Sequence, residues 1–250
     1  MPSPLSSAAR KAVFAPLDGA GRAEAVARRL RDAIGLGLIA DGEQLPTESD
    51  LATQLGVSTV TLREALAMLR HQGLVRTRRG RGGGTFVEAP ADPSTVPLRA
   101  RLREITSDEL RDIWDMHEAV AGAAARLAAA RASSDQSARL REHAATVAHE
   151  DTPGARRRAD GRFHIEVAAA AQSPRLTHAE LTLQSNIGDL LWLPGSEALT
   201  PKDAAQQHEE IAAAIGCGDA ALARTLAEEH VRQEMSRLVD LHLRLVRGTK

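Results

Sequence analysis

Hydrophobic residues between positions 47 and 73 recur three and four residues apart in two short segments. They are Leu51, Ala52 and Leu55 in the first segment and Leu62, Leu66 and Leu69 in the second. Each segment begins at a side chain that can cap a helix, Thr47 or Ser58, and ends at a glycine, Gly56 or Gly73. The pattern predicts two short amphipathic helices joined by a tight turn, which is the arrangement of a helix-turn-helix.

After Gly73 the helical period gives way to alternation. The segments 74–79 (LVRTRR) and 85–88 (TFVE) flank a glycine-rich stretch at 80–84, and this pattern predicts a two-stranded hairpin. A third amphipathic helix is predicted over 22–38, before the other two. Together these elements make a winged helix-turn-helix of three helices and a hairpin wing.

The chain beyond the hairpin is predicted to be helical to its end. Residues 90–98 contain three prolines and are predicted to form a linker. Six helices are then expected, at 106–131, 135–150, 155–171, 174–192, 201–215 and 219–246. We therefore predict a mainly α protein with a flexible arm at 1–20, a winged domain at 21–89, and a helical bundle at 99–250.

Charge separates the two predicted domains. The chain as a whole has a net charge of −1, but the segment from Ser58 to Phe86 has six arginines and one acidic residue, Glu64. Residues 90–250 hold 20 basic and 24 acidic side chains. A basic head on a body that is not basic is typical of a protein that binds double-stranded DNA through the head.

The DNA-contacting side chains are expected at the start of the second helix of the motif and in the wing, because hydroxyl and guanidinium groups reach phosphates and base edges and glycines let a backbone approach a partner closely. The candidates are Ser58, Thr59, Thr61, Arg63, Arg78, Arg79, Arg81 and Gly82.

The remaining composition points to a cytoplasmic protein. The single cysteine, Cys217, excludes an internal disulfide and is expected to fill a small space in the core. No apolar run is long enough to span a bilayer, and residues 1–20 lack the apolar segment of a signal peptide, so no membrane partner is expected. Core positions are predicted for Trp114 and Trp192. Surface positions are predicted for His71, His143, His149, His178 and His242.

One carboxylate and three imidazoles recur on the predicted helices of the bundle. Asp160 and His164 are four residues apart, so they lie on one helix face. His208 and His230 lie among apolar residues of two later helices. Such a set can hold a divalent transition metal through nitrogen and oxygen. An Asp–His pair at this spacing is also common as an ordinary helix pair, so spacing alone leaves both interpretations open.

Residues 21–88 resemble the winged helix-turn-helix of the GntR superfamily of bacterial transcription regulators. The resemblance rests on LPTESDLATQLGVSTVTLREALAMLRHQGLV and on RRGRGGGTFV in the wing. Arg63 and the wing glycines match the family pattern. Ser49 and Thr59 replace arginines that commonly contact DNA, so the usual operator of the family is not implied.

The helical body resembles the FCD domain of the FadR branch of this superfamily, through D-x-x-F-H, HEEIAAAIGCGDAALA and EEHV. The resemblance implies that Asp160, His164, His208 and His230 hold a divalent transition metal, zinc or nickel, beneath a pocket for a small carboxylic acid. Where the family has an effector-binding arginine on the first helix of the domain, this chain has His117. Ala121 replaces a glutamate four residues later.

These features predict a homodimeric transcription regulator, a repressor of a metabolic operon, whose DNA affinity depends on the metal and a small carboxylate effector. One alternative is a metalloenzyme with an appended nucleic-acid-binding module, in which Glu166 or Glu209 could act as a base. A second is a non-allosteric architectural DNA binder. No catalytic triad or phosphate-binding loop is found, so we expect no enzymatic activity.

Overall fold

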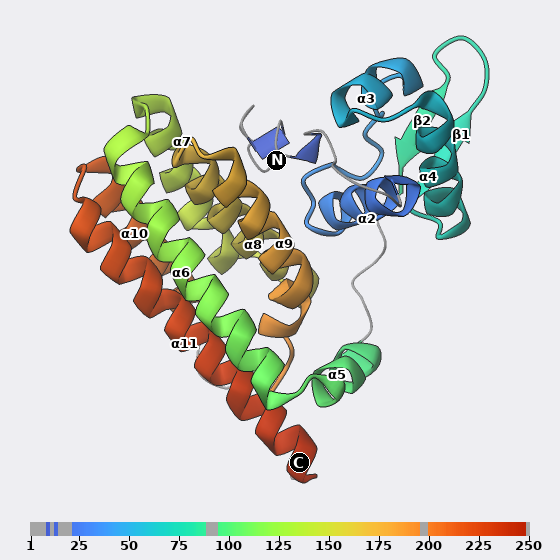
Figure 1. The fold of residues 1–250 in the computed structure, drawn as a ribbon. Coiled ribbons are helices and arrows are strands. Elements are labelled where there is room, and N and C mark those ends of the chain that lie inside the picture. The colour runs from blue at the N-terminus through green and yellow to red at the C-terminus, as the bar shows by residue number, and fades with distance from the viewer. Residues whose placement is uncertain (1–8, 11–12, 15–21, 89–94, 196–199, 249–250) are drawn as a thin grey trace. The chain divides into compact units, whose positions relative to one another are not determined.

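The computed structural model describes residues 9–10, 13–14, 22–88, 95–195 and 200–248. Two compact units are present: one comprises Arg10–Ala91, and the other comprises Asp92–Lys250 together with Met1–Ala9. Most of the predicted arm at 1–20 lies outside the described residues, and within it Ala9, Arg10 and Val13 are helical. The predicted fold class, a mainly α chain with a winged N-terminal unit, is confirmed (Figure 1).

The winged unit is built on the helices α2 (Arg22–Gly35), α3 (Glu48–Leu55) and α4 (Thr59–His71). Both helices of the predicted motif begin at the expected caps, since Thr47 accepts a hydrogen bond from the backbone of Asp50 and Ser58 from that of Thr61. Gly56 ends α3 with φ +66°, a left-handed conformation that favours glycine. The apolar stripes of α3 and α4 are buried as expected.

The wing consists of strands β1 (Val75–Arg78) and β2 (Gly84–Val87), paired antiparallel with Val75 opposite Val87. An isolated bridge connects Gln44 to Phe86 at its edge. The Gln44 amide donates to the Gly83 carbonyl at 3.1 Å. This contact ties the base of the glycine-rich turn to the segment before α3.

Among its described residues, the helical unit contains seven α-helices and one short 3-10 helix, where six helices were predicted. Its helices are α5 (Thr95–Glu104), α6 (Ser107–Arg131), α7 (Ser134–Ala144), η1 (Thr146–His149), α8 (Pro153–Ala170), α9 (Pro174–Leu191), α10 (Pro201–Gly216) and α11 (Ala220–Arg247). The linker prediction is wrong over 95–98, because Pro97 lies in the first turn of α5, where a missing N–H costs no hydrogen bond. The helix predicted over 135–150 ends at Ala144, and η1 follows.

Helices α6 and α11 pack side by side along much of their length, and α8 packs against α6, α7 and α9 (Figure 1). Most α8 side chains are therefore buried, and its small alanines allow the close approach. The core is built mainly from Leu, Ala, Ile and Val, with Phe163 completely buried. None of the described helices has the length and hydropathy needed to cross a membrane.

Three predictions of burial are wrong. His143 and His242 are buried, and the Nδ1 atom of His242 lies 2.8 Å from the Leu102 carbonyl of α5. Leu102 lies on α5, the helix that the sequence analysis did not predict. Cys217 is exposed because it follows α10 in a turn. Trp114 and Trp192 are half-buried and pack against the core as expected.

Candidate metal centre and nucleic-acid interface

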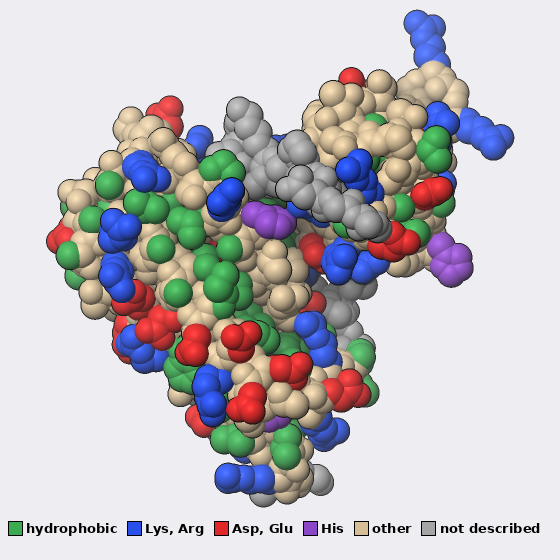
Figure 2. Space-filling view, in the orientation of Figure 1, with side chains coloured by type: hydrophobic (Ala, Val, Ile, Leu, Met, Phe, Trp, Pro, Cys, Tyr) green, Lys and Arg blue, Asp and Glu red, His purple; other side chains and the backbone are tan. Residues whose placement is uncertain are grey.

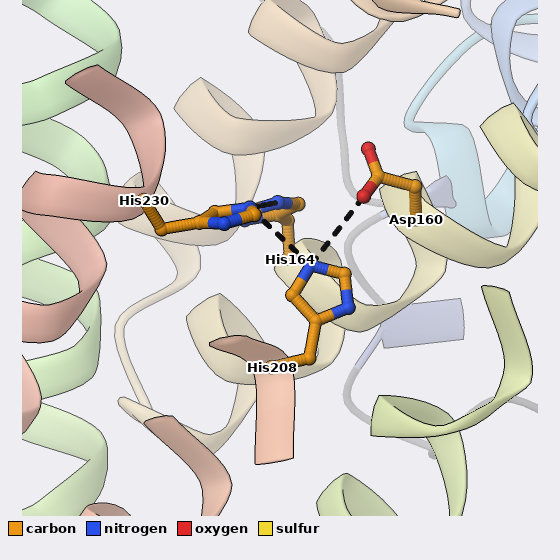
Figure 3. A group of neighbouring side chains, drawn as sticks. All are labelled: Asp160, His164, His208 and His230. Carbon is orange, nitrogen blue, oxygen red and sulfur yellow. Dashed lines mark hydrogen bonds and ion pairs between the residues drawn. The ribbon is translucent and has the colours of Figure 1, made fainter. Parts of the chain in front are cut away.

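Three helices bring the predicted metal-ligating side chains together. Asp160 and His164 come from α8, His208 from α10 and His230 from α11. Each offers one ligand atom, and these atoms all lie within 4.8 Å of one another. Figure 3 shows the four side chains pointing toward a common centre. The structure thus assembles the set that sequence spacing alone left ambiguous.

The three histidines meet through their Nε2 atoms. His230 Nε2 lies 3.2 Å from that of His164 and 3.3 Å from that of His208. Asp160 Oδ1 lies 3.4 Å from His208 Nε2 (Figure 3). Each pair of facing nitrogens needs a proton between them to form a hydrogen bond, and neutral imidazoles have too few protons for all of these pairs. A cation can instead accept a lone pair from each nitrogen.

Burial sets the protonation states of this cluster. All four side chains are less than a tenth exposed. Burial lowers the pKa of His164 to about 3 and those of His208 and His230 well below their ordinary value. Because these imidazoles are neutral at neutral pH, their lone pairs are available to a metal. Burial raises the pKa of Asp160 to about 7.

Neighbouring side chains fix the orientation of two ligands. Gln207 Oε1 lies 2.7 Å from His230 Nδ1, and because this oxygen can only accept, Nδ1 carries the proton. The Nε2 lone pair of His230 then faces the cluster. Phe163 stacks on the His208 ring with 4.0 Å between centroids. The donor set, its burial and these supporting contacts fit a divalent transition metal.

Two buried glutamates adjoin the cluster, and both were missed in the sequence analysis. Glu234 Oε2 lies 3.5 Å from His230 Nε2 and has no hydrogen-bond partner. It follows His230 by one helical turn, which is a signal that the spacing could have revealed. Glu180 Oε1 lies 3.7 Å from Nε2 of His117, the residue predicted to bind the effector. No comparable spacing in the sequence connects Glu180 to the cluster, because it lies on α9, which carries none of the four candidate ligands.

The predicted DNA-contacting residues of α4 lie at its exposed N-terminal end. Ser58 caps the helix and Thr61 is half-buried beside it, whereas Thr59 and Arg63 are exposed. Arg63 Nε donates to Glu48 Oε2 of α3 at 2.7 Å. Val60 is 61% exposed and was not predicted as a contact. An exposed methyl-bearing side chain here suits a thymine methyl group.

The predicted wing residues gather at the β1–β2 turn. Arg79, Arg81 and Gly82 are exposed between the strands, and the Arg78 guanidinium lies 4.5 Å from the centroid of the Phe86 ring. Figure 2 shows basic side chains projecting from the end of the winged unit where Figure 1 draws this turn. The turn therefore presents positive charge on a backbone with little side-chain bulk.

Comparison with curated proteins identifies transcription regulators as relatives. The chain is 42% identical over 244 residues to a putative HTH-type transcriptional regulator, RmpR, of Mycobacterium gastri, covering 97% of this chain and 88% of that protein. It is 32% identical to the putative L-lactate dehydrogenase operon regulatory protein of Escherichia coli K12, covering 82% of each. The metalloenzyme alternative finds no support among these relatives.

Solved structures share the fold. Escherichia coli McbR/YncC matches with a TM-score of 0.51 and 19% sequence identity, covering 89% of this chain and 99% of that chain. A GntR-family regulator from Pseudomonas syringae pv. tomato also has a TM-score of 0.51, at 19% identity, covering 96% and 97%.

Two family descriptions match the two units. Residues 22–87 match "Bacterial regulatory proteins, gntR family", and residues 112–233 match the FCD domain. Proteins of this family bind DNA and are typically dimers. The winged unit, the helical unit and the related regulators together show that the chain belongs to the GntR family of transcription regulators, in the group with a C-terminal FCD domain.

Proposed function

We propose that this regulator is a cytoplasmic homodimer that represses a metabolic operon and responds to a small carboxylic acid bound at a divalent metal. The observation that carries the proposal is the convergence of Asp160, His164, His208 and His230 within 4.8 Å in a regulator with a DNA-binding head. An architectural DNA binder would not need such a buried polar set, which is costly to bury without a ligand.

The metal, zinc or nickel, would be held by the three Nε2 atoms and the Asp160 carboxylate. Bound there, it would supply positive charge and open coordination positions for an anionic oxygen. The unpartnered Oε2 atom of Glu234 supports a centre with room for another oxygen ligand. His117 is completely buried and its ring centroid lies 5.9 Å from that of His164. This proximity supports its proposed contact with the effector.

DNA recognition is proposed to use the end of α4 and the wing. Arg63, exposed at the start of α4, is suited to a guanine edge or a phosphate. Ser58, Thr59 and Thr61 have hydroxyl groups near the same helix end, where backbone N–H groups also favour phosphate. The turn residues Arg78, Arg79, Arg81 and Gly82 are proposed to contact the DNA backbone or the minor groove.

Effector binding can change DNA affinity only if the effector prefers one arrangement of the two winged heads over another. The proposed coupling is therefore tested by removing the metal site while leaving the head intact. His208→Ala leaves three ligands, and we expect it to lose at least about 10-fold to 100-fold in metal affinity. The response of operator affinity to the effector should disappear as well.

The measurement is operator affinity for wild type and His208→Ala, each with and without the effector and before and after chelation. DNA binding by the head should persist in all cases, because no proposed ligand lies in residues 1–90. Metal analysis of purified protein distinguishes this function from an architectural role. A chelated wild-type protein that responds to the effector as strongly as the metal-loaded one would disprove the coupling.

A further inference from the structure

A pocket of about 190 Å³ lies beside the proposed metal centre, between the start of α8, the end of α9, the start of α10 and the middle of α11. Its lining includes Arg156, Trp192, Pro194, Pro201, Glu234 and Arg237. Glu234 connects the pocket to the centre, because its Oε2 atom lies 3.5 Å from His230 Nε2 and 4.0 Å from His164 Nε2. A small molecule in the pocket would therefore contact a side chain that touches two proposed metal ligands.

The pocket has a second link to the centre through Trp192. Trp192 lines the pocket and packs against the small core cluster of Val147, Ala159, Ala204 and Ala205. Ala159 of this cluster directly precedes Asp160 on α8. The pocket and the metal cluster are neighbouring parts of one continuous region of the helical unit.

The pocket also contains two guanidinium groups that no carboxylate neutralises by contact. Among the described residues, Arg156 and Arg237 form no ion pair within 4.0 Å, and Arg156 Nε donates only to the Glu150 carbonyl at 2.9 Å. Arg237 Nη2 is buried and has no hydrogen-bond partner. A buried guanidinium N–H without an acceptor destabilises the folded protein. An anionic ligand at this position would supply the missing hydrogen-bond acceptor.

Glu234, Asp160 and Asp203 act on Arg237 by charge at longer range, without forming an ion pair with it. Glu234 is at the metal side of the pocket, whereas Arg156 belongs to the start of α8. His117 cannot replace these arginines, because its Nε2 atom faces Glu180 at 3.7 Å.

We infer that Arg156 and Arg237 form an anion-binding subsite, and that the effector is a small acid with two anionic groups. One group points toward the metal centre and the other, a carboxylate or a phosphate, binds the two guanidinium groups. Arg237 and Arg156 are then specificity-determining residues, because they select a diacid over a monoacid of the same length. This inference rests on the proposed function, since the first group is the one bound at the metal.

The test measures binding of matched acids to the metal-loaded full-length protein by calorimetry. Succinate and glutarate are compared with butyrate and valerate, which lack the second acidic group. We expect one diacid to bind at least about 10-fold more tightly than its matched monoacid, because charge-assisted bonds to arginine are among the stronger hydrogen bonds in proteins. Phosphonopropionate, compared with succinate, distinguishes a phosphate subsite from a carboxylate subsite.

Arg237→Gln and Arg156→Gln should each remove the advantage of the diacid while leaving monoacid affinity and metal content unchanged. Arg175→Gln is the matched control, because Arg175 is exposed on α9 and does not line the pocket. Arg156→Gln, near the start of α8, remains informative if the Arg237 variant fails to fold. Unfolding midpoints establish that each variant is native.

Different results would contradict the anion-binding subsite and the metal-dependent binding of the effector. A diacid advantage that is absent in wild type, or that survives in a folded Arg237→Gln or Arg156→Gln variant, would overturn the subsite. Monoacid binding that is unaffected by chelation, by contrast, would overturn the metal-dependent effector of the proposed function. The diacid comparison would then still report on the arginines, because both members of each pair lose the same metal contribution.

Discussion

At the scale of single residues, Arg63 is an exposed guanidinium of α4 whose orientation is constrained by a contact with the neighbouring helix. Its 2.7 Å contact with Glu48 joins α4 to α3. Arg63 is largely exposed and Glu48 partly exposed, so the ion pair adds little to stability. Its effect is to restrict the orientation of Arg63 in a chain where Ser49 and Thr59 replace two arginines common in the family.

Arg63→Ala should therefore weaken binding to the specific operator by about 1–3 kcal/mol and relax the preference at one base position. Arg79→Ala, in the wing, should weaken binding to all sequences alike and reduce the salt dependence. Electrophoretic or fluorescence titrations on specific and random duplexes at several salt concentrations measure both effects. Equal losses on the two duplexes for Arg63→Ala would show that Arg63 contacts only phosphate.

His143 gives a prediction about pH that is independent of the metal set. Burial, together with the charge of Arg162, lowers its pKa from 6.5 to about 4. Between these values the unfolded chain binds a proton and the folded chain does not, so stability falls as the pH decreases through this window. The loss attributable to His143 is at most about 1.4 kcal/mol per pH unit.

The measurement is urea unfolding of chelated wild type and His143→Gln between neutral pH and about pH 4. Wild type should lose stability more steeply than the variant as the pH decreases, and the difference isolates His143. Chelation keeps metal release from contributing. Parallel stability curves for the two proteins would contradict the assignment.

At the scale of elements, the wing depends on a turn that has no space for a side chain at Gly83. A Cβ atom there would lie 2.6 Å from the Arg78 carbonyl oxygen and 2.8 Å from that of Gly80. Both are backbone atoms, so the turn itself has to move. The positions of Arg79 and Arg81 relative to α4 would change with it.

Gly83→Ala should consequently reduce operator affinity, by about 10-fold if one wing contact is lost, while the helical unit keeps its stability and metal content. Gly35→Ala is the control, because a Cβ atom at the end of α2 meets no atom within 4 Å. Operator titration and thermal unfolding of both variants measure the effect. Unchanged operator affinity in Gly83→Ala would indicate that the wing does not contact DNA.

At the scale of the whole molecule, one recognition helix and one wing contact too few base pairs for useful specificity. We therefore expect two chains to bind a near-palindromic site, with each winged unit on one half-site. Footprinting and light scattering of the complex at physiological salt measure the protected length and the stoichiometry. A single protected half-site with one bound chain would contradict the dimer.

The sequence by itself determined the elements with strong local signals. Helices α3 and α4 follow from caps, apolar spacing and closing glycines, all of which act within one or two turns. The wing follows from alternation around a glycine-rich turn. The four metal-ligating candidates were also predicted, but spacing could not distinguish a metal site from ordinary helix pairs.

Only the tertiary structure decided which side chains share a centre. The convergence of His164, His208 and His230, the proximity of Glu234, and the pocket with Arg156 and Arg237 depend on how α8, α10 and α11 pack. The burial of His143 and His242 was missed for the same reason. Hydrophobic spacing predicts which face of a helix is buried. The partner of each buried polar atom, however, lies on another helix, at a sequence separation that no local pattern encodes.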